Sequence, residues 1–268
     1  MPQHSLMPFH RYWQDWTTAE LAAVDKDQIV ALLPVAAIEQ HGPHLPLSTD
    51  AAINRAIVDT AVERMSPELP VVVLPAQEIG LSPEHCNFAG TLTVEATTLS
   101  RLWTEIGDSL ARTGVRKLLI FNSHGGQPQV MEGVAQDLRL RHSMLAAHVS
   151  WFDFGVPDGM FDAEELAHGI HGGALETSIM LYAEPGSVRL DKLADFPTEG
   201  KHIAEDFRWL GPTGPVPFGW MSEDLNRQGA MGNATAADAD KGRQLVEHLA
   251  RCLIETLQEV KRFDPPFD

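Results

Sequence analysis

The stretch from Ile29 to Asp50, IVALLPVAAIEQHGPHLPLSTD, decides the fold of this chain. Its first six residues form a continuous apolar run, which is typical of a strand covered on both faces of a sheet. A polar turn follows, and residues 50–65 (DAAINRAIVDTAVERM) then carry apolar side chains at helical spacing. A buried strand, a polar turn and a helix in this order favour a layered α/β fold.

The same alternation continues along the chain. Apolar runs at residues 71–74 (VVVL) and 116–121 (RKLLIF) predict two further strands, and residues 145–150 are a weaker candidate. Segments 97–113, 129–141 and 237–262 predict helices; the first begins with Thr and Ser capping candidates, and Gly114 suits its end. Strands that alternate with helices indicate an α/β fold with a mainly parallel sheet.

Length and charge exclude several classes of protein. The 268 residues suit one large domain spanning 1–268. A net charge of −17 argues against nucleic acid and anionic membranes as partners, because both bind basic side chains. Cys86 and Cys252 form no disulfide framework, residues 1–16 show no leader pattern, and no apolar stretch could span a bilayer. We therefore expect a cytoplasmic protein.

Residues 186–232 differ from the rest of the chain. They are rich in Gly and Pro, including the run GPTGP at 211–215, yet carry Phe207, Trp209, Phe218 and Trp220. A solvated linker would not hold so many large apolar side chains. This segment is predicted to be a lid or a contact between subunits of a homo-oligomer.

The turn after the first strand carries candidate metal ligands. Glu39 and His41 alternate, so in an extended segment both side chains leave on the same side, and Asp50 returns at the start of the next helix. Carboxylate and imidazole together suit Zn²⁺, Mn²⁺ or Fe²⁺. The alternative makes Asp50 a helix N-cap and His41 an ordinary loop residue.

Two later stretches place polar side chains in similar turns. His124 follows the run RKLLIF and precedes two glycines, which let a ligand approach the backbone closely. His171 and Glu176 flank the start of an apolar segment, where a buried carboxylate needs a partner. The alternatives are a hydrogen-bonded structural histidine at 124 and a capping role for Glu176.

Four stretches together resemble the creatininase family. They are EQHGPHLP (39–46), EHCNFAGT (84–91), NSHGGQ (122–127) and HGGALETS (171–178), in this order and at the expected spacing. The resemblance implies a three-layer α/β/α fold, two adjacent divalent metal ions and a homohexamer. Zn²⁺ is the metal we expect first, with Mn²⁺ or Fe²⁺ as alternatives.

The resemblance also implies a role for each site residue. The expected metal ligands are Glu39, His41, Asp50, His124 and Glu176. Asp50 would bridge the ions, His171 would carry a proton, and Glu176 is counted with His171 among the catalytic residues. A water that bridges the ions would then attack the carbonyl of a small amide, and His171 would protonate the departing nitrogen.

Two positions depart from creatininase itself. Gly126 stands where that enzyme is expected to carry a ligand Glu, and Ala167 where it carries a Trp. Both departures weaken creatinine as the substrate and favour Glu176 as the fifth ligand. The function predicted is hydrolysis of a C–N bond, as in a cyclic amide, in a small molecule. Formamide deformylation, peptide processing and a catalytically silent metal-binding protein are the alternatives.

Overall fold

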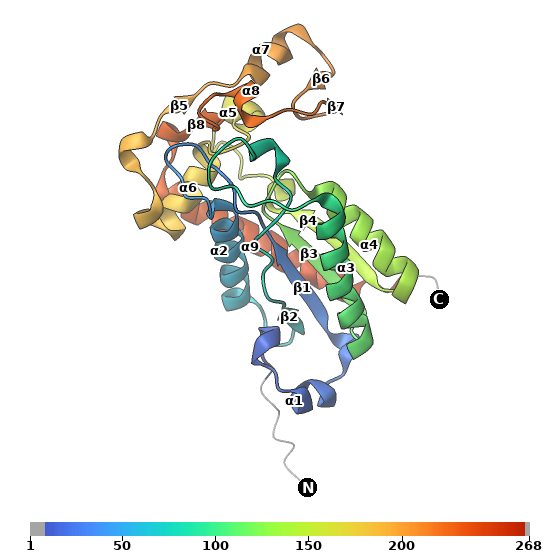
Figure 1. Ribbon diagram of the computed structural model, residues 1–268. Coiled ribbons are helices and arrows are strands. Elements are labelled where there is room, and N and C mark those ends of the chain that lie inside the picture. Colours follow the sequence, from blue (N-terminus) through green and yellow to red (C-terminus); the bar gives the residue numbers. More distant parts are fainter. Residues whose placement is uncertain (1–8, 266–268) are drawn as a thin grey trace.

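Four parallel strands form the central sheet of the computed structural model, which describes residues 9–265 (Figure 1). The strands are β1 (Val30–Val35), β2 (Val71–Val73), β3 (Lys117–Asn122) and β4 (Leu145–Ser150), in the order β2-β1-β3-β4. All four predicted strands are therefore confirmed. The expectation about a leader concerns residues 1–16, of which residues 1–8 lie outside the described residues.

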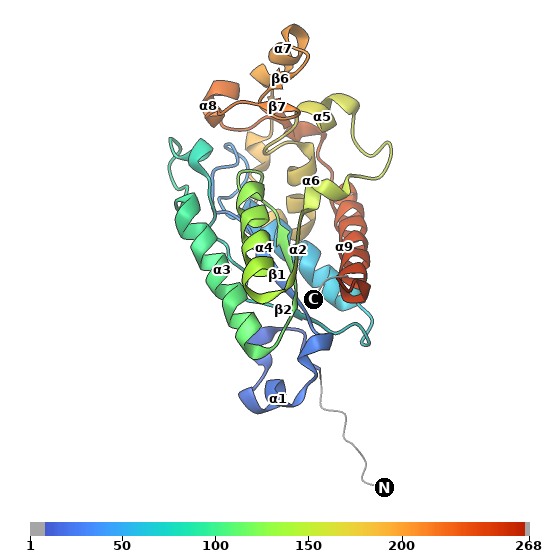
Figure 2. The same cartoon turned by 90° about the vertical axis from the view of Figure 1, so that its right-hand side faces the viewer.

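Helices cover both faces of this sheet (Figure 2). On one face lie α2 (Thr49–Arg64), α6 (Ala174–Ala183) and α9 (Ala239–Arg262), and on the other α3 (Ala96–Thr113) and α4 (Pro128–His142). This arrangement confirms the three-layer α/β/α fold.

Alternation along the strands explains why the sheet needs both layers. Val30 and Leu32 of β1 pack with α2, α6 and α9, whereas Ala31 and Leu33 pack with α3 and α4. Successive side chains of a strand point to opposite faces, so a run without polar residues exposes apolar surface on both sides. Only helices on both faces bury that surface.

The helix predicted at residues 97–113 is confirmed, but its predicted Thr or Ser cap was wrong. Helix α3 begins at Ala96 after an extended Glu95, so Thr97 lies inside its first turn, and no side chain caps the helix. The predicted end is confirmed: Gly114 adopts a left-handed conformation (φ 100°), which a glycine reaches at little cost.

The loop-rich segment 186–232 folds over the carboxyl ends of the strands, at the top of Figure 1. It holds β5 (Asp195–Phe196), α7 (Glu199–Asp206), β6 (Leu210–Gly211), β7 (Val216–Pro217) and α8 (Ser222–Leu225), and β8 (Gly232–Asn233) pairs with β5. The remaining helices are α1 (Thr18–Ala23) and α5 (Ala163–His168). Within residues 9–265 no helix is both long and apolar enough to cross a membrane.

Stability should depend on the two-sided core. We expect Leu119→Ala to lower the free energy of unfolding by about 2–5 kcal/mol, because the fully buried side chain leaves a cavity between β3 and its helices. Leu140→Ala is the control, since Leu140 is 80% exposed. Chemical denaturation measures both variants; equal stabilities would contradict this assignment of the core.

Candidate metal centre

The carboxyl ends of the strands bring the predicted site residues together. The segment 36–48 connects β1 to α2, residues 74–95 follow β2, and residues 123–127 connect β3 to α4. In parallel sheets these ends meet at one edge, where ligands bind. The N-terminus of α6 reaches the same place, because His44 contacts both Gly172 and Thr177.

Two asparagines fix these turns. Asn54 on α2 donates to the carbonyl oxygens of Val35 (3.0 Å) and Phe121 (3.1 Å), and so ties the ends of β1 and β3 together. Asn122 accepts a hydrogen bond from the backbone N–H of His124 at 3.0 Å. The two turns are therefore held by side chains that satisfy backbone groups at the sheet edge.

Hydrogen bonds to carbonyl oxygens orient two imidazoles. Nδ1 of His41 lies 3.1 Å from the Glu39 carbonyl oxygen, and Nε2 of His124 lies 2.8 Å from that of Leu81. A carbonyl only accepts, so each of these nitrogens carries a hydrogen. The opposite nitrogens, Nε2 of His41 and Nδ1 of His124, then face the carboxylates, an orientation typical of metal-binding histidines.

Asp50 lies between the two histidines. Its Oδ1 is 3.2 Å from Nε2 of His41, and its Oδ2 is 3.3 Å from Nδ1 of His124. Glu39 lies on the His124 side of Asp50, since its Oε1 is 3.2 Å from Nδ1 of His124. Two ligands of one metal ion lie roughly 3 Å apart when each bond is about 2.0–2.2 Å long.

Unsatisfied atoms test whether a cation fits. Glu39 Oε2, His41 Nε2 and Asp50 Oδ2 are buried and have no hydrogen-bond partner among the described residues. Buried polar groups are seldom left unpaired, because the lost hydrogen bond to water is costly. The three atoms belong to three of the predicted ligands, so the donors present fit a metal centre.

Glu176 lies beside His41. Its Oε2 is 4.0 Å from Nε2 of His41, and the same oxygen accepts a hydrogen bond from the Gly172 N–H at 2.6 Å. Glu176 therefore accepts a hydrogen bond from the backbone at the start of α6, as the capping alternative expects, and it also lies close to the cluster. Burial raises the pKa of this carboxyl to about 7, so the carboxylate needs a nearby positive charge at neutral pH.

Positive charge at this edge comes only from histidines in the described part of the chain, since every ion-pair partner of Glu39, Asp50 and Glu176 is an imidazole. Burial would lower the pKa of His41, but the adjacent Asp50 raises it to about 9. The carboxylates therefore attract a cation, which is either a proton or a metal ion.

His171 and His85 complete a stack of three imidazoles. The ring of His171 lies between those of His41 (4.1 Å between centroids) and His85 (4.3 Å). Its Nε2 is 2.6 Å from the Gln40 carbonyl oxygen, so this nitrogen carries the hydrogen and Nδ1 faces Glu39 at 3.8 Å. Burial, reinforced by the charges of His41 and His85, lowers the pKa of His171 well below its usual value.

Two residues that the sequence did not assign to the site contribute to it. His85 places its Nε2 3.3 Å from Glu39 Oε1, while its Nδ1 lies 2.6 Å from the Ser222 hydroxyl and 2.8 Å from the Gln40 amide nitrogen. The motif EHCNFAGT was the signal for His85. Ser222 comes from the loop-rich segment, which has no motif that connects it to the cluster.

His44, although part of the motif EQHGPHLP, lies outside the cluster. His44 is a structural residue: it bonds the Gly172 carbonyl oxygen at 2.9 Å and stacks on Phe196. Asp50 is not the N-cap of α2, because Ser48 holds that position.

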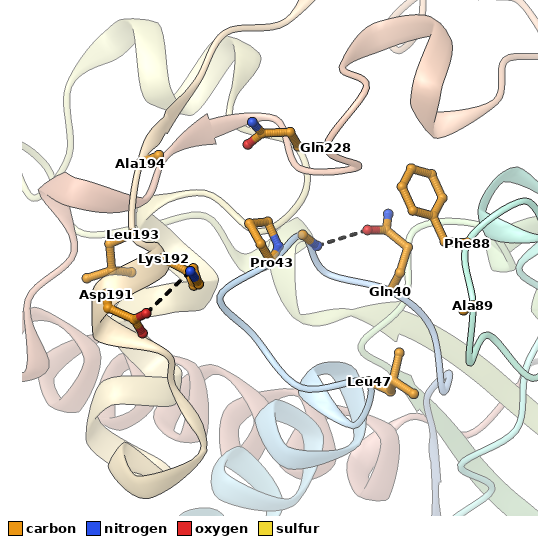
Figure 3. Close-up of a pocket in the computed structure, with 11 residues that line it drawn as sticks. Gln40, Pro43, Leu47, Phe88, Ala89, Asp191, Lys192, Leu193, Ala194 and Gln228 are labelled. Atoms are coloured by element: carbon orange, nitrogen blue, oxygen red, sulfur yellow. Dashed lines mark hydrogen bonds and ion pairs between the residues drawn. The ribbon is translucent and has the colours of Figure 1, made fainter.

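The structure also has a separate cavity of about 640 Å³, and Figure 3 shows the side chains that line it. Pro43, Leu47, Phe88 and Leu193 line it, and no residue of the metal cluster does so. Gln40 is common to both places: it lines the cavity, and its amide bonds His85. The cavity is therefore distinct from the buried cluster of carboxylates and histidines.

Comparisons with known proteins identify the family of this fold. The family profile described as creatininase, creatinine amidohydrolase, matches residues 14–257. The chain belongs to the creatininase family. The family is one of amidohydrolases, so the predicted enzyme class, a hydrolase of carbon–nitrogen bonds, is confirmed.

Characterised relatives of the creatininase family differ in their substrates. The chain is 29% identical over 238 residues to the mycofactocin precursor peptide peptidase of Mycolicibacterium smegmatis, covering 88% of this chain and 86% of the relative. It is 28% identical over 265 residues to the creatinine amidohydrolase of Pseudomonas putida, covering 92% and 94%.

Solved creatininase structures share the fold. One described as manganese creatininase has a TM-score of 0.76 and 24% identity, with 95% of this chain and 99% of that chain covered. Another, a variant of the Zn–Zn type, has a TM-score of 0.75 and 24% identity, with 95% and 98% covered.

Removing the charge of Asp50 tests the centre. We expect Asp50→Asn to lose most of its bound metal, because the carboxylate facing both histidines becomes a neutral amide of similar size. Elemental analysis after loading with Zn²⁺ or Mn²⁺ measures this. The control is Glu63→Gln, an exposed residue of the same helix. Wild-type metal content in Asp50→Asn would contradict the assignment.

Proposed function

We propose that this chain is an amidohydrolase that uses two divalent metal ions to hydrolyse a C–N bond in a small molecule. The observation that carries the proposal is the position of Asp50, whose two oxygens face two different histidines. A carboxylate in that position can bind one ion with each oxygen. A cytoplasmic location, as the sequence predicts, belongs to the same proposal.

The donors divide into two groups around Asp50. Glu39 and His124 would hold one ion, and His41 and Glu176 the other, with Asp50 shared. Mixed nitrogen and oxygen donors suit Zn²⁺ or Mn²⁺ better than Mg²⁺ or Ca²⁺, with Fe²⁺ as a further alternative. When bound, such ions polarise a carbonyl and lower the pKa of water.

His171 is the proposed proton carrier. Its Nε2–H is held by the Gln40 carbonyl oxygen, so Nδ1 is free to accept a proton at the edge of the cluster. An amide nitrogen is a poor leaving group until it is protonated, and a neutral imidazole can take up a proton and pass it on. A silent metal-binding protein would not need this imidazole.

Space for a substrate exists beside Gly125. A Cβ built on this exposed glycine would meet no atom within 4 Å, so an incoming carbonyl can approach the backbone there. We propose that backbone N–H groups near Gly125 and Gly126 stabilise the negative charge that develops on the carbonyl oxygen.

The proposed substrate is a small cyclic amide. A second candidate is a peptide, because four of the matched relatives are mycofactocin precursor peptide peptidases at 29–30% identity. Formamide hydrolysis needs the same chemistry and remains an alternative.

The segment 186–232 is proposed to be a lid or a subunit contact of a single-domain protein. Phe207 and Trp209 are each more than half exposed, and Ser222 joins the segment to His85. A homo-oligomer, such as the hexamer implied by family resemblance, would cover these aromatic rings. Light scattering that shows a monomer would oppose the subunit-contact alternative.

Removing the His171 imidazole separates catalysis from metal binding. His171→Ala should retain the metal ions while the rate falls by about 10²–10⁴-fold, the usual contribution of a positioned acid–base group. Elemental analysis and turnover are measured together, with His168→Ala as the control from the same stretch. If His171→Ala instead loses metal, His171 is a ligand.

A hydrolysis screen tests the substrate class. We expect creatinine to be turned over at least about 10²-fold less efficiently than the best cyclic amide, because displaced reacting groups are costly. Gly126 and Ala167 replace groups that creatininase is expected to use. The screen should include formamides and short peptides. Efficient creatinine hydrolysis would overturn this expectation, and preference for a peptide would select the second candidate.

A further inference from the structure

Gly126 occupies a position that leaves no room for a side chain. A Cβ built there would collide with Oε1 of Glu84, with Nε2 of His124 and with the carbonyl oxygen of Leu81. The turn after β2 therefore fills the space that a side chain at 126 would enter. Position 126 carries no acidic side chain, and the carboxylate of Glu84 fills the space that such a side chain would enter.

Glu84 lies at the edge of the metal cluster. It belongs to the short helical turn Pro83–His85, and its side chain is 14% exposed. One of its carboxylate oxygens forms a group with a carboxylate oxygen of Glu39 and a ring nitrogen of His124, all within 4.8 Å of one another. No other carboxylate approaches this group from the β2 turn within the described residues.

A hydrogen bond from His124 does not explain this position. Glu84 Oε1 is 3.6 Å from His124 Nε2, but that nitrogen already donates its hydrogen to the Leu81 carbonyl oxygen at 2.8 Å. A neutral imidazole has one N–H, so none is left for Glu84. The carboxylate thus lies beside the cluster without a donor from this ring.

Glu176 does not serve this side of the cluster. It groups with His41 and Asp50, whereas Glu84 groups with Glu39 and His124. The sequence had favoured Glu176 as the replacement for the acid missing at 126. The carboxylate that lies against position 126 is that of Glu84.

We propose that Glu84 is a further ligand of the ion held by Glu39 and His124, and that it takes the place of an acid at position 126. The inference rests on the proposed two-metal function. It also balances charge: Glu39, Asp50, Glu84 and Glu176 carry four negative charges, which two divalent cations neutralise.

Metal titration tests the role of Glu84. Wild type, Glu84→Gln and Glu84→Asp are compared by calorimetric titration of the metal-free protein with Zn²⁺, and by elemental analysis. Glu84→Gln should weaken one of two sites by at least about 10-fold, and Glu84→Asp should recover part of that loss. Glu78→Gln, an exposed acid of the same loop, is the control.

The outcomes distinguish the two proposals. Wild type that binds fewer than two ions would refute the proposed function. Wild type that binds two ions, with unchanged affinities in Glu84→Gln, would overturn the assignment of Glu84 alone.

A direct measurement avoids variants altogether. In crystals of the Zn²⁺-loaded wild type, anomalous scattering locates each ion, and a Glu84 oxygen is expected about 2.0–2.2 Å from one of them. A separation beyond hydrogen-bonding distance would likewise overturn the proposal.

Discussion

Compensation of buried negative charge is the constraint on which this site depends. Glu39 and Asp50 are almost completely buried, and the described residues offer them imidazoles but no Lys or Arg. An isolated buried carboxylate would cost several kcal/mol or would take up a proton. One ring nitrogen of His41 and one of His124 each donate a hydrogen bond to a carbonyl oxygen, so the other nitrogen of each ring faces the carboxylates. This arrangement suits a shared cation.

The central sheet holds the charged side chains close together at the ends of its strands. Asn54 and Asn122 satisfy backbone groups at the strand ends, so the turns that carry the ligands are held rigidly. The apolar layers on both faces exclude water from beneath the cluster. A low-dielectric surrounding strengthens the attraction of the carboxylates for a metal ion, and it equally penalises leaving them unpaired. The apolar layers that stabilise the fold therefore also strengthen the attraction of the site for a cation.

Family membership limits the chemistry without naming the substrate. The chain is almost equally similar to a peptide peptidase and to a creatinine amidohydrolase, although those enzymes act on different molecules. Metal ions held by the proposed centre would polarise a carbonyl in either case, whereas selection of the substrate would depend on the residues around the centre. Here Gly125 is open and Ala167 lies on the exposed side of α5.

The sequence by itself determined the layers, the strand bounds to within a residue or two and the stretches that supply Glu39, His41, Asp50, His124 and Glu176. Those features follow from local periodicity and from motifs contiguous along the chain. Only the tertiary structure decided which nitrogen of each histidine faces the carboxylates. It also placed Glu84 over Gly126 and Ser222 against His85. Such contacts join residues 42 and 137 positions apart, and their geometry depends on how loops pack at one sheet edge rather than on any local pattern.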